Sequence, residues 1–196
     1  MRLLPFIVLL FCCAGCAAGF DSTVPVADLI NIVDPTPGRV PFGDRWVRVD
    51  AFSDAREKEA LISINGRAVM PDDTVALHVT HAFEDYLRLN DYRLAQMRGP
   101  LLRGEVLEWF ADVQTGFPTS KESAKAAIRI LVIDDRGSTI YSAVYNGASS
   151  LQHPFLTESK VKRVLGEAMQ TAIEGVLKDA GFLQAVDEAR RSLGEN

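Results

Sequence analysis

The stretch that decides the fold lies between residues 101 and 146. It contains three apolar segments: LLRGEVLEWFADV (101–113), SAKAAIRILVI (123–133) and STIYSAVYN (138–146). The second segment alternates apolar and polar side chains, which is typical of a strand with one buried face. Between the second and third segments, Asp134-Asp135-Arg136-Gly137 is a turn sequence whose glycine can adopt a positive φ. The sequence therefore predicts three strands, the last two forming an antiparallel hairpin.

A helix is predicted on each side of these strands. Before them, apolar residues recur at helical spacing over 74–90. After them, Thr157 opens a longer amphipathic pattern that Gly181 ends or bends. A second, weaker helical segment is predicted over 182–193.

Shorter strands are predicted at 45–52, 60–64 and 92–96. The order of the elements favours an α+β domain over 44–185, with a mainly antiparallel sheet of about four to six strands packed on one face by two helices. A partly helical tail, 186–196, follows this domain. A sheet that is covered on one face leaves the other for water or a partner.

Four aromatic residues on the predicted strands form a candidate interaction surface: Trp109, Phe110, Tyr141 and Tyr145. On the uncovered face they would make an exposed apolar patch, which marks an interaction site. The alternative is that they are core residues or scattered surface aromatics.

The N-terminus, MRLLPFIVLLFCCAGCAAGF (1–20), predicts a lipoprotein signal peptide over residues 1–15. One positive residue, Arg2, precedes an apolar region and a run of small residues. The run Cys13-Ala14-Gly15-Cys16 looks like a bacterial lipobox, in which cleavage precedes the cysteine and lipid is attached to it. We therefore expect lipidation of Cys16. Two alternatives are cleavage after Ala18 by an ordinary signal peptidase and a retained membrane span.

The lipid on Cys16 makes the membrane the first expected partner, because two or three acyl chains anchor a protein stably. Ala17 follows the cysteine, and no aspartate stands there to act as the inner-membrane retention signal known in enteric bacteria. We expect the periplasmic face of the outer membrane, with the inner membrane as the alternative. Prolines and glycines over 16–43 predict a tether. It is either a passive spacer or, through Leu29–Val33, docked on the domain or a partner.

Composition excludes several classes of protein. From residue 16 onward the chain has 20 basic and 26 acidic residues, so nucleic acid is not an expected partner. All three cysteines lie within the first 16 residues, which excludes a disulfide scaffold and a cysteine-based zinc site in the domain.

No catalytic, metal or cofactor site is expected. His78 and His81 are three residues apart on the first predicted helix, but no third ligand accompanies them. Glu105, Glu108 and Asp112 follow one strand, where carboxylates usually form a solvated face; acid–base chemistry would need a cleft.

The chain resembles the YajG-like family of bacterial lipoproteins over roughly residues 44–185. The resemblance rests on the order of elements around four features: FEDYLRLNDYRL, WFADV, IYSAVYNGAS and the closing VKRVLGEAMQTAIEGVLKDAGF. It implies an envelope lipoprotein with no catalytic residues to carry over. We expect a non-enzymatic domain that binds another envelope component, such as an unknown envelope protein. An auxiliary lipid-binding subunit of an envelope transport system is the alternative, and a carboxylate-dependent hydrolase comes last.

Overall fold

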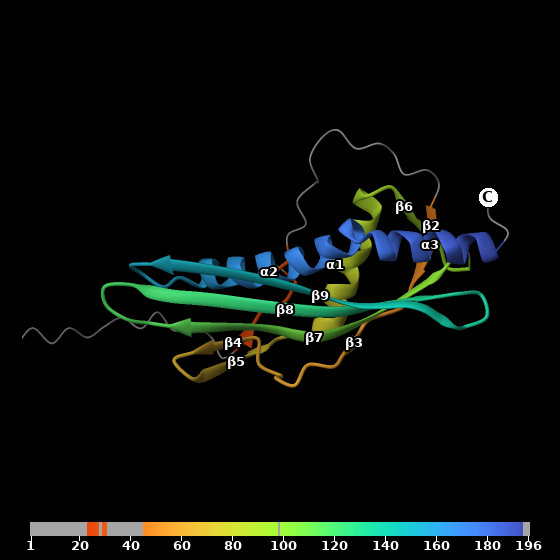
Figure 1. Cartoon of the computed structure of the whole chain (residues 1–196). Coiled ribbons are helices and arrows are strands. Elements are labelled where there is room, and N and C mark those ends of the chain that lie inside the picture. Colours follow the sequence, from red (N-terminus) through yellow and green to blue (C-terminus); the bar gives the residue numbers. More distant parts are fainter. Residues whose placement is uncertain (1–22, 28, 31–44, 98, 194–196) are drawn as a thin grey trace, which may run out of the picture.

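The computed structural model describes residues 23–27, 29–30, 45–97 and 99–193. Over these residues the chain forms a nine-stranded sheet and three helices (Figure 1). The strands are β1 (Thr23–Val24), β2 (Arg45–Val49), β3 (Ser53–Asp54), β4 (Ile62–Ile64), β5 (Arg67–Pro71), β6 (Tyr92–Leu94), β7 (Leu101–Gln114), β8 (Ser120–Ile133) and β9 (Thr139–His153). The helices are α1 (Val75–Leu89), α2 (Glu158–Lys178) and α3 (Ala180–Ser192).

The long strand β7 organises the sheet. Along one edge it pairs antiparallel with β8, which in turn pairs antiparallel with β9. Along its other edge it pairs with three short parallel strands in succession, β2, β3 and β4. The sheet continues through the antiparallel pair β4–β5 and the parallel pairs β1–β5 and β2–β6.

The expected α+β class is confirmed, but the expected sheet of four to six mainly antiparallel strands is wrong. The sheet is mixed and has nine strands over the described residues. The reason is that β2, β3 and β4 lie end to end along β7 and run in its direction. Each has only two to five residues, too few to show a period. Neither β1 nor β5 was expected.

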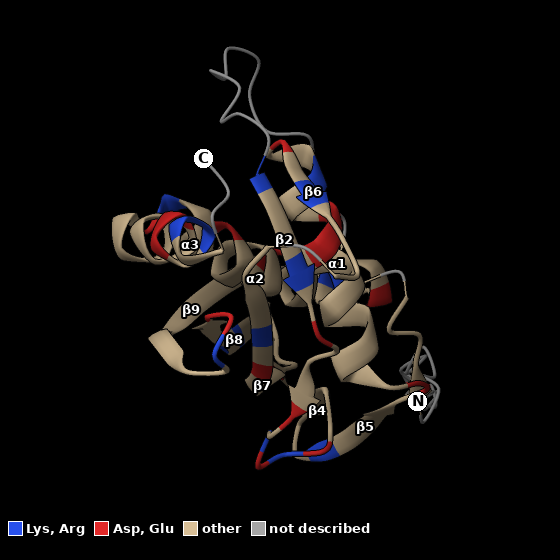
Figure 2. Ribbon diagram, turned by 90° about the vertical axis from the view of Figure 1, so that its right-hand side faces the viewer, with Lys and Arg blue, Asp and Glu red and all other residues tan. Residues whose placement is uncertain are grey.

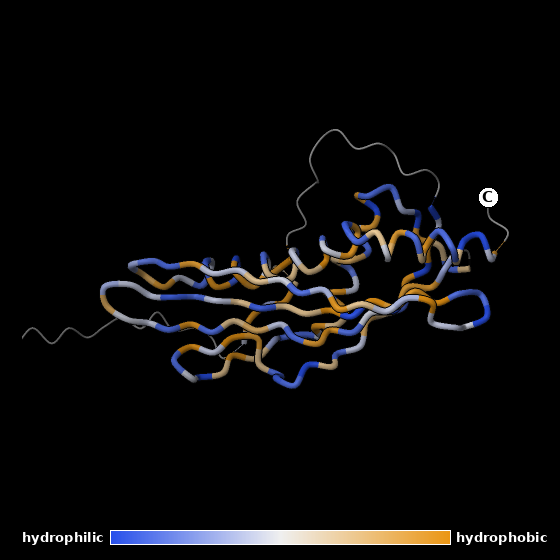
Figure 3. The backbone as a smooth tube through the Cα atoms, viewed as in Figure 1, coloured by the Kyte–Doolittle hydropathy of each residue, from blue (hydrophilic) through white to orange (hydrophobic). Residues whose placement is uncertain are grey.

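The antiparallel hairpin at the heart of the fold is confirmed. The turn between β8 and β9 is hydrophilic (Figure 3). Gly137 in this turn has φ +80°, and its N–H donates to the carbonyl oxygen of Asp134 at 3.2 Å. The Asp134 carboxylate accepts from the N–H groups of Arg136 and Ser138. Beyond the turn, β9 extends seven residues past Asn146, where the apolar pattern had been expected to end.

All three helices lie on the same side of the β9–β8–β7–β4–β5 arc (Figure 2). The two long helical patterns are confirmed as α1 and α2. The third helix, α3, begins directly after Asp179 and continues to Ser192. Its residues Val186 and Ala189 are buried in the core, so packed structure extends beyond the expected boundary at residue 185.

A β-bulge in β7 decides which of its residues enter the core. The pairing of β7 with β8 shifts between Val106 and Glu108, so Leu107 is an extra residue in β7. Even-numbered positions are buried before the bulge, and odd-numbered positions after it. The bulge therefore turns Trp109 to the same face as Val106, toward the helices.

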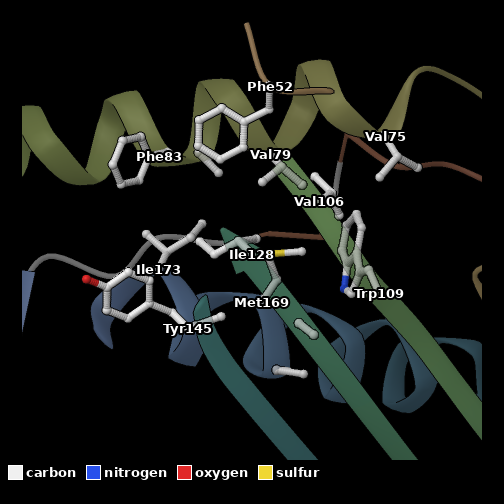
Figure 4. Packing of buried hydrophobic residues seen from close by; sticks show 14 of the residues in the cluster. Phe52, Val75, Val79, Phe83, Val106, Trp109, Ile128, Tyr145, Met169 and Ile173 are labelled. Atoms are coloured by element: carbon white, nitrogen blue, oxygen red, sulfur yellow. The ribbon is translucent and has the colours of Figure 1, made fainter. Parts of the chain in front are cut away.

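Trp109 joins the sheet to α2 in the core (Figure 4). Its side chain is 1% exposed, and its Nε1–H donates to the carbonyl oxygen of Leu165 at 3.0 Å. On the α1 side, the rings of Phe52 and Phe83 pack with centroids 5.4 Å apart. One continuous core thus lies between the sheet and both long helices.

The closest approach of helix to sheet occurs at Gly147 in β9. A Cβ atom at this position would lie 1.9 Å from the carbonyl oxygen of Ala168 in α2. Since real Cβ atoms do not approach other atoms so closely, only glycine fits here. The helix therefore sits directly over the outermost strand.

The described part of the 16–43 interval packs on the domain. Val24, Val26 and Leu29 are at most 3% exposed, and β1 adds to the sheet beside β5. The N–H of Val26 donates to the carboxylate of Asp72 at 2.9 Å. Val24, Val26 and Leu29 are therefore held on the domain, as the docking alternative required for Leu29; residues 31–33 of that alternative lie outside the described residues. Signal peptide 1–15, Cys16 and most of the interval lie outside the described residues.

We expect Leu29→Ala to lower the free energy of unfolding by about 2–4 kcal/mol, the usual cost of truncating a buried leucine. Urea unfolding at neutral pH measures this change. Leu77→Ala, at a leucine that is 42% exposed on α1, is the matched control and should cost much less. Equal, small effects of both changes would contradict the packing of Leu29 on the domain.

Gly147→Ala should destabilise the domain by about 3 kcal/mol, because α2 must move away from β9 to admit the new methyl group. Gly116→Ala is the control, since its Cβ would meet its nearest atom at 3.3 Å. Thermal unfolding of both variants tests this. A Gly147→Ala protein as stable as the Gly116→Ala control would show that the close approach is absent.

Candidate functional site

The sheet face opposite the helices carries the outward side chains of β7, β8 and β9. The outward residues of β8 include three cations, Lys121, Lys125 and Arg129. Arg129 forms an ion pair with Glu105 on β7. On β9 the exposed apolar residues are Ile140 and Val144, 37% and 44% exposed. This face is thus mixed in character rather than a continuous apolar patch.

The structure does not bring the four predicted aromatic residues together. Trp109 and Tyr145 are buried beneath α2, and Tyr141 lies on the same side, against Phe182 of α3. Only Phe110 points to the opposite face, because neighbouring residues of a strand face opposite ways. The predicted surface of Trp109, Phe110, Tyr141 and Tyr145 is therefore corrected: three of its members belong to the helix-covered side.

Tyr141 and Tyr145 instead fix the junction between α2 and α3. Their hydroxyl groups lie 2.5 and 3.0 Å from Oδ2 of Asp179, the residue between the two helices. The other carboxylate oxygen accepts from the N–H of Gly181 and so caps α3. The hydrogen bond from Tyr141 holds the pKa of Asp179 below its usual value, while burial raises the pKa of both tyrosines.

Phe110 lies beside a hollow of about 510 Å³ at the bulge of β7. The Nζ of Lys58 sits 4.2 Å from the centre of the Phe110 ring, a cation–π contact. The wall is completed by the 55–58 segment and by residues of β7 and β8. This hollow is small and charged at its rim.

The carboxylates of β7 do not converge on a reaction centre. Glu105 pairs with Arg129, and Asp112 accepts a hydrogen bond from Gln114 at 3.0 Å. Glu108 is exposed at the bulge. Their arrangement is that of a solvated strand face, without the shared cleft that acid–base catalysis requires.

The two histidines of α1 line a second hollow, of about 640 Å³, between that helix and Val26, Ala27 and Ile30. His78 contacts the carboxylate of Asp73 through Nε2 at 3.1 Å. Within the described part of the chain, no group of three or more potential metal ligands occurs.

Glu122 is a buried carboxyl group that the sequence interpretation missed. It is 0% exposed on the helix side of β8, and neither oxygen has a hydrogen-bond partner among the described residues. Burial raises its pKa, and the charges of His153 and Lys160 act in the opposite direction. Glu122 lies on the same face of β8 as the buried residues Ala124 and Ala126. The alternating pattern of this strand could therefore have indicated that Glu122 is buried.

The most distinctive feature is the outer edge of β9, which we call the open edge. Among the described residues, β9 pairs only with β8, so its other edge presents unpaired N–H and C=O groups. All 15 residues, TIYSAVYNGASSLQH, lack Lys, Arg, Asp, Glu and Pro. Such edges normally carry protective charges, prolines or bulges. Of these devices β9 has one, a register shift against β8 that leaves Ile140 as an extra residue near its start, and from Tyr141 to His153 it pairs regularly. The open edge is therefore the candidate functional site, with strand addition as the chemistry it permits.

We expect Asp179→Asn to reduce stability at pH 7 by about 1 kcal/mol, because charge-assisted hydrogen bonds from the tyrosines are lost while an N-cap residue is retained. A depressed pKa stabilises the folded state above the unfolded-state pKa of about 3.8, and this contribution disappears as the pH falls further. The difference from wild type should therefore shrink below pH 4.

Urea unfolding at pH 7 and pH 3 checks this expectation, with Asp91→Asn at an exposed position as the control. If the free energy of unfolding of Asp179→Asn differs from that of the wild type by the same amount at both pH values, the charge of Asp179 does not contribute to stability.

Solved structures resemble this chain to different degrees, all at low sequence identity. A DUF330-family protein from Xanthomonas campestris superposes with a TM-score of 0.52 at 10% identity, covering 88% of this chain and 98% of that one. A neuraminyllactose-binding hemagglutinin homologue from Helicobacter pylori gives a TM-score of 0.48 at 7% identity, covering 80% and 99% of the two chains. For a minor lipoprotein from Acinetobacter baumannii the TM-score is 0.43 at 14% identity, with coverage of 74% and 96%. No curated protein sequence matches the chain.

Membership of a family is decided by the sequence itself. Residues 47–186 match the family Lipoprotein_16, described as uncharacterized lipoprotein, and these residues include α1, α2 and every strand from β3 to β9. A lipoprotein family implies a membrane-anchored location in the envelope. In the described residues, no helix is both long and apolar enough to cross a membrane. The chain belongs to the Lipoprotein_16 family of bacterial lipoproteins.

Proposed function

We propose that this lipoprotein is a non-enzymatic binding module of the YajG-like type. In this proposal, lipid on Cys16 anchors it to the periplasmic face of the outer membrane, and its domain binds another envelope component. The observation that carries the proposal is the open edge, a long strand without the charges and prolines that normally block pairing.

The packed N-terminal segment supports a position close to the membrane. Only six residues separate Cys16 from Thr23, where the described fold begins. A chain of this length spans at most about 25 Å. A lipid on Cys16 would therefore hold the domain near the bilayer surface, where envelope partners are concentrated.

The arrangement of polar groups favours a protein partner over lipid or a substrate. A lipid-binding subunit of a transport system needs an apolar pocket, whereas both hollows are rimmed by charged residues such as Arg56, Lys58, Asp85 and Arg88. A hydrolase needs convergent carboxylates, and those of β7 are spread along an exposed face. These observations rank the lipid-binding alternative second and the hydrolase last.

We predict that Cys16→Ser abolishes labelling by a fatty-acid probe and releases the protein from the membrane fraction, because the acyl attachment point is lost. Cys12→Ser is the matched control, since it removes a neighbouring thiol of the predicted signal peptide outside the lipobox and should leave labelling intact. Separation of inner and outer membranes by density locates the wild-type protein.

The same cells test the binding role. Crosslinking in intact cells at native expression should give a discrete adduct for the wild type in the outer-membrane fraction. Full labelling of the Cys16→Ser protein would overturn the anchor. Recovery of the anchored wild type without any adduct would overturn the binding role.

A further inference from the structure

The open edge differs from the other edge strands of the sheet, β1 and β6. β1 has two residues and is followed directly by Pro25, and β6 has three residues. Short strands and prolines are common means of preventing edge-to-edge association. β9 has 15 residues with no proline and no charged side chain among Asp, Glu, Lys and Arg. The chain thus protects its other margins and leaves β9 open to pairing.

The helices over β9 favour a lone segment over a second copy of this chain at the open edge. They cover β9 along most of its length: Tyr141 packs on Phe182 of α3, Gly147 lies under Ala168 of α2, and the Ser149 hydroxyl donates to Glu167 of α2 at 2.7 Å. A second β9 paired here with its helices on the same face would have to fit them beside these, at the roughly 8–10 Å that packed helices need. A lone extended segment, with no helix above it, needs no such fit.

The positive charges of β8, next to the open edge, favour binding of a segment with acidic side chains. Lys121 and Lys125 are exposed on the outer face of β8, and neither forms an ion pair among the described residues. Glu108 and Asp112 of β7 lie diagonally beside Lys125, on the side away from β9. Lys125 lies opposite Ala148 of β9 in the sheet register. Because Ala148 is small, the flexible lysine side chain can extend across β9 toward an added strand. Arg129, by contrast, is already paired with Glu105.

We propose, on the basis of the binding role above, that the open edge takes an extended acidic peptide segment of a partner protein as an added strand. Backbone hydrogen bonds to β9 provide the affinity. Carboxylates on alternate residues, facing outward, meet Lys121 and Lys125. Apolar residues at the other end of the segment pack beside the exposed Ile140 and Val144.

The test uses synthetic 12-residue peptides and the lipidated full-length mature protein in detergent micelles. The first peptide alternates Glu with Val and Thr, the second replaces each Glu with Lys, and the third is the acidic peptide N-methylated at alternate backbone nitrogens. Fluorescence anisotropy measures binding. The acidic peptide should bind at least fivefold more tightly than either of the others, because the second lacks the charge and the third the backbone donors.

Charge reversal then locates the site on the protein. The double variant Lys121→Glu and Lys125→Glu should bind the acidic peptide at least fivefold more weakly than the wild type does. It should bind the Lys peptide more tightly than the wild type does. Arg67→Glu, an exposed change on β5, is the matched control and should change neither affinity. Both variants leave the sequence of β9 unchanged, and circular dichroism is used to check that each is folded.

Equal binding of the acidic and N-methylated peptides would overturn strand addition, and equal binding of the acidic and Lys peptides would overturn the charge preference. A dimer by sedimentation that dissociates when peptide is added would show that a second copy occupies the edge instead. If cells yield an envelope adduct while the peptides fail to bind, the binding role stands and this assignment of its site is wrong.

Discussion

The contact between α2 and β9 at Gly147 sets how closely the helical layer approaches the sheet. The absence of a side chain lets the helix settle over the outermost strand, with the Ala168 carbonyl oxygen where a Cβ would otherwise lie. From that position the helix also reaches Trp109 of β7, whose indole donates to the Leu165 carbonyl oxygen. One helix thereby covers all three long strands. The same placement covers one face of β9 and leaves its outer edge unpaired among the described residues.

The second organising feature is β7, which pairs with an antiparallel strand along one edge and with parallel strands along the other. Its regular edge holds the antiparallel partner β8, and its other edge collects three short parallel strands. The bulge at Leu107 keeps both halves of the strand aimed into one core. The N-terminal segment completes this half of the sheet through β1, so the path from the predicted anchor to the domain is short. A binding surface on such a domain would operate close to the membrane.

The spacing of apolar residues predicted those helices and strands that are long enough to show a regular pattern in the sequence. The β8–β9 hairpin with its glycine turn and the amphipathic helices α1 and α2 were all visible, because local chemistry determines them. The parallel pairings of β2, β3 and β4 were not, since short strands depend on contacts far along the chain. The predicted aromatic surface failed in part because Trp109 and Phe110 are adjacent, and adjacent strand residues face opposite ways. The sequence shows that β9 has no charged residues. Only the structure shows that β9 is an edge strand, which makes this absence of charge significant for binding.

Amide hydrogen exchange along residues 139–153 of the purified protein shows directly whether β9 presents an unpaired edge. In an antiparallel edge strand, alternate N–H groups bond to the neighbour and the others face solvent. An unpaired edge predicts alternating slow and fast exchange along β9. Uniformly slow exchange, with every amide as protected as those of β8, would contradict it, because the edge would then already be covered.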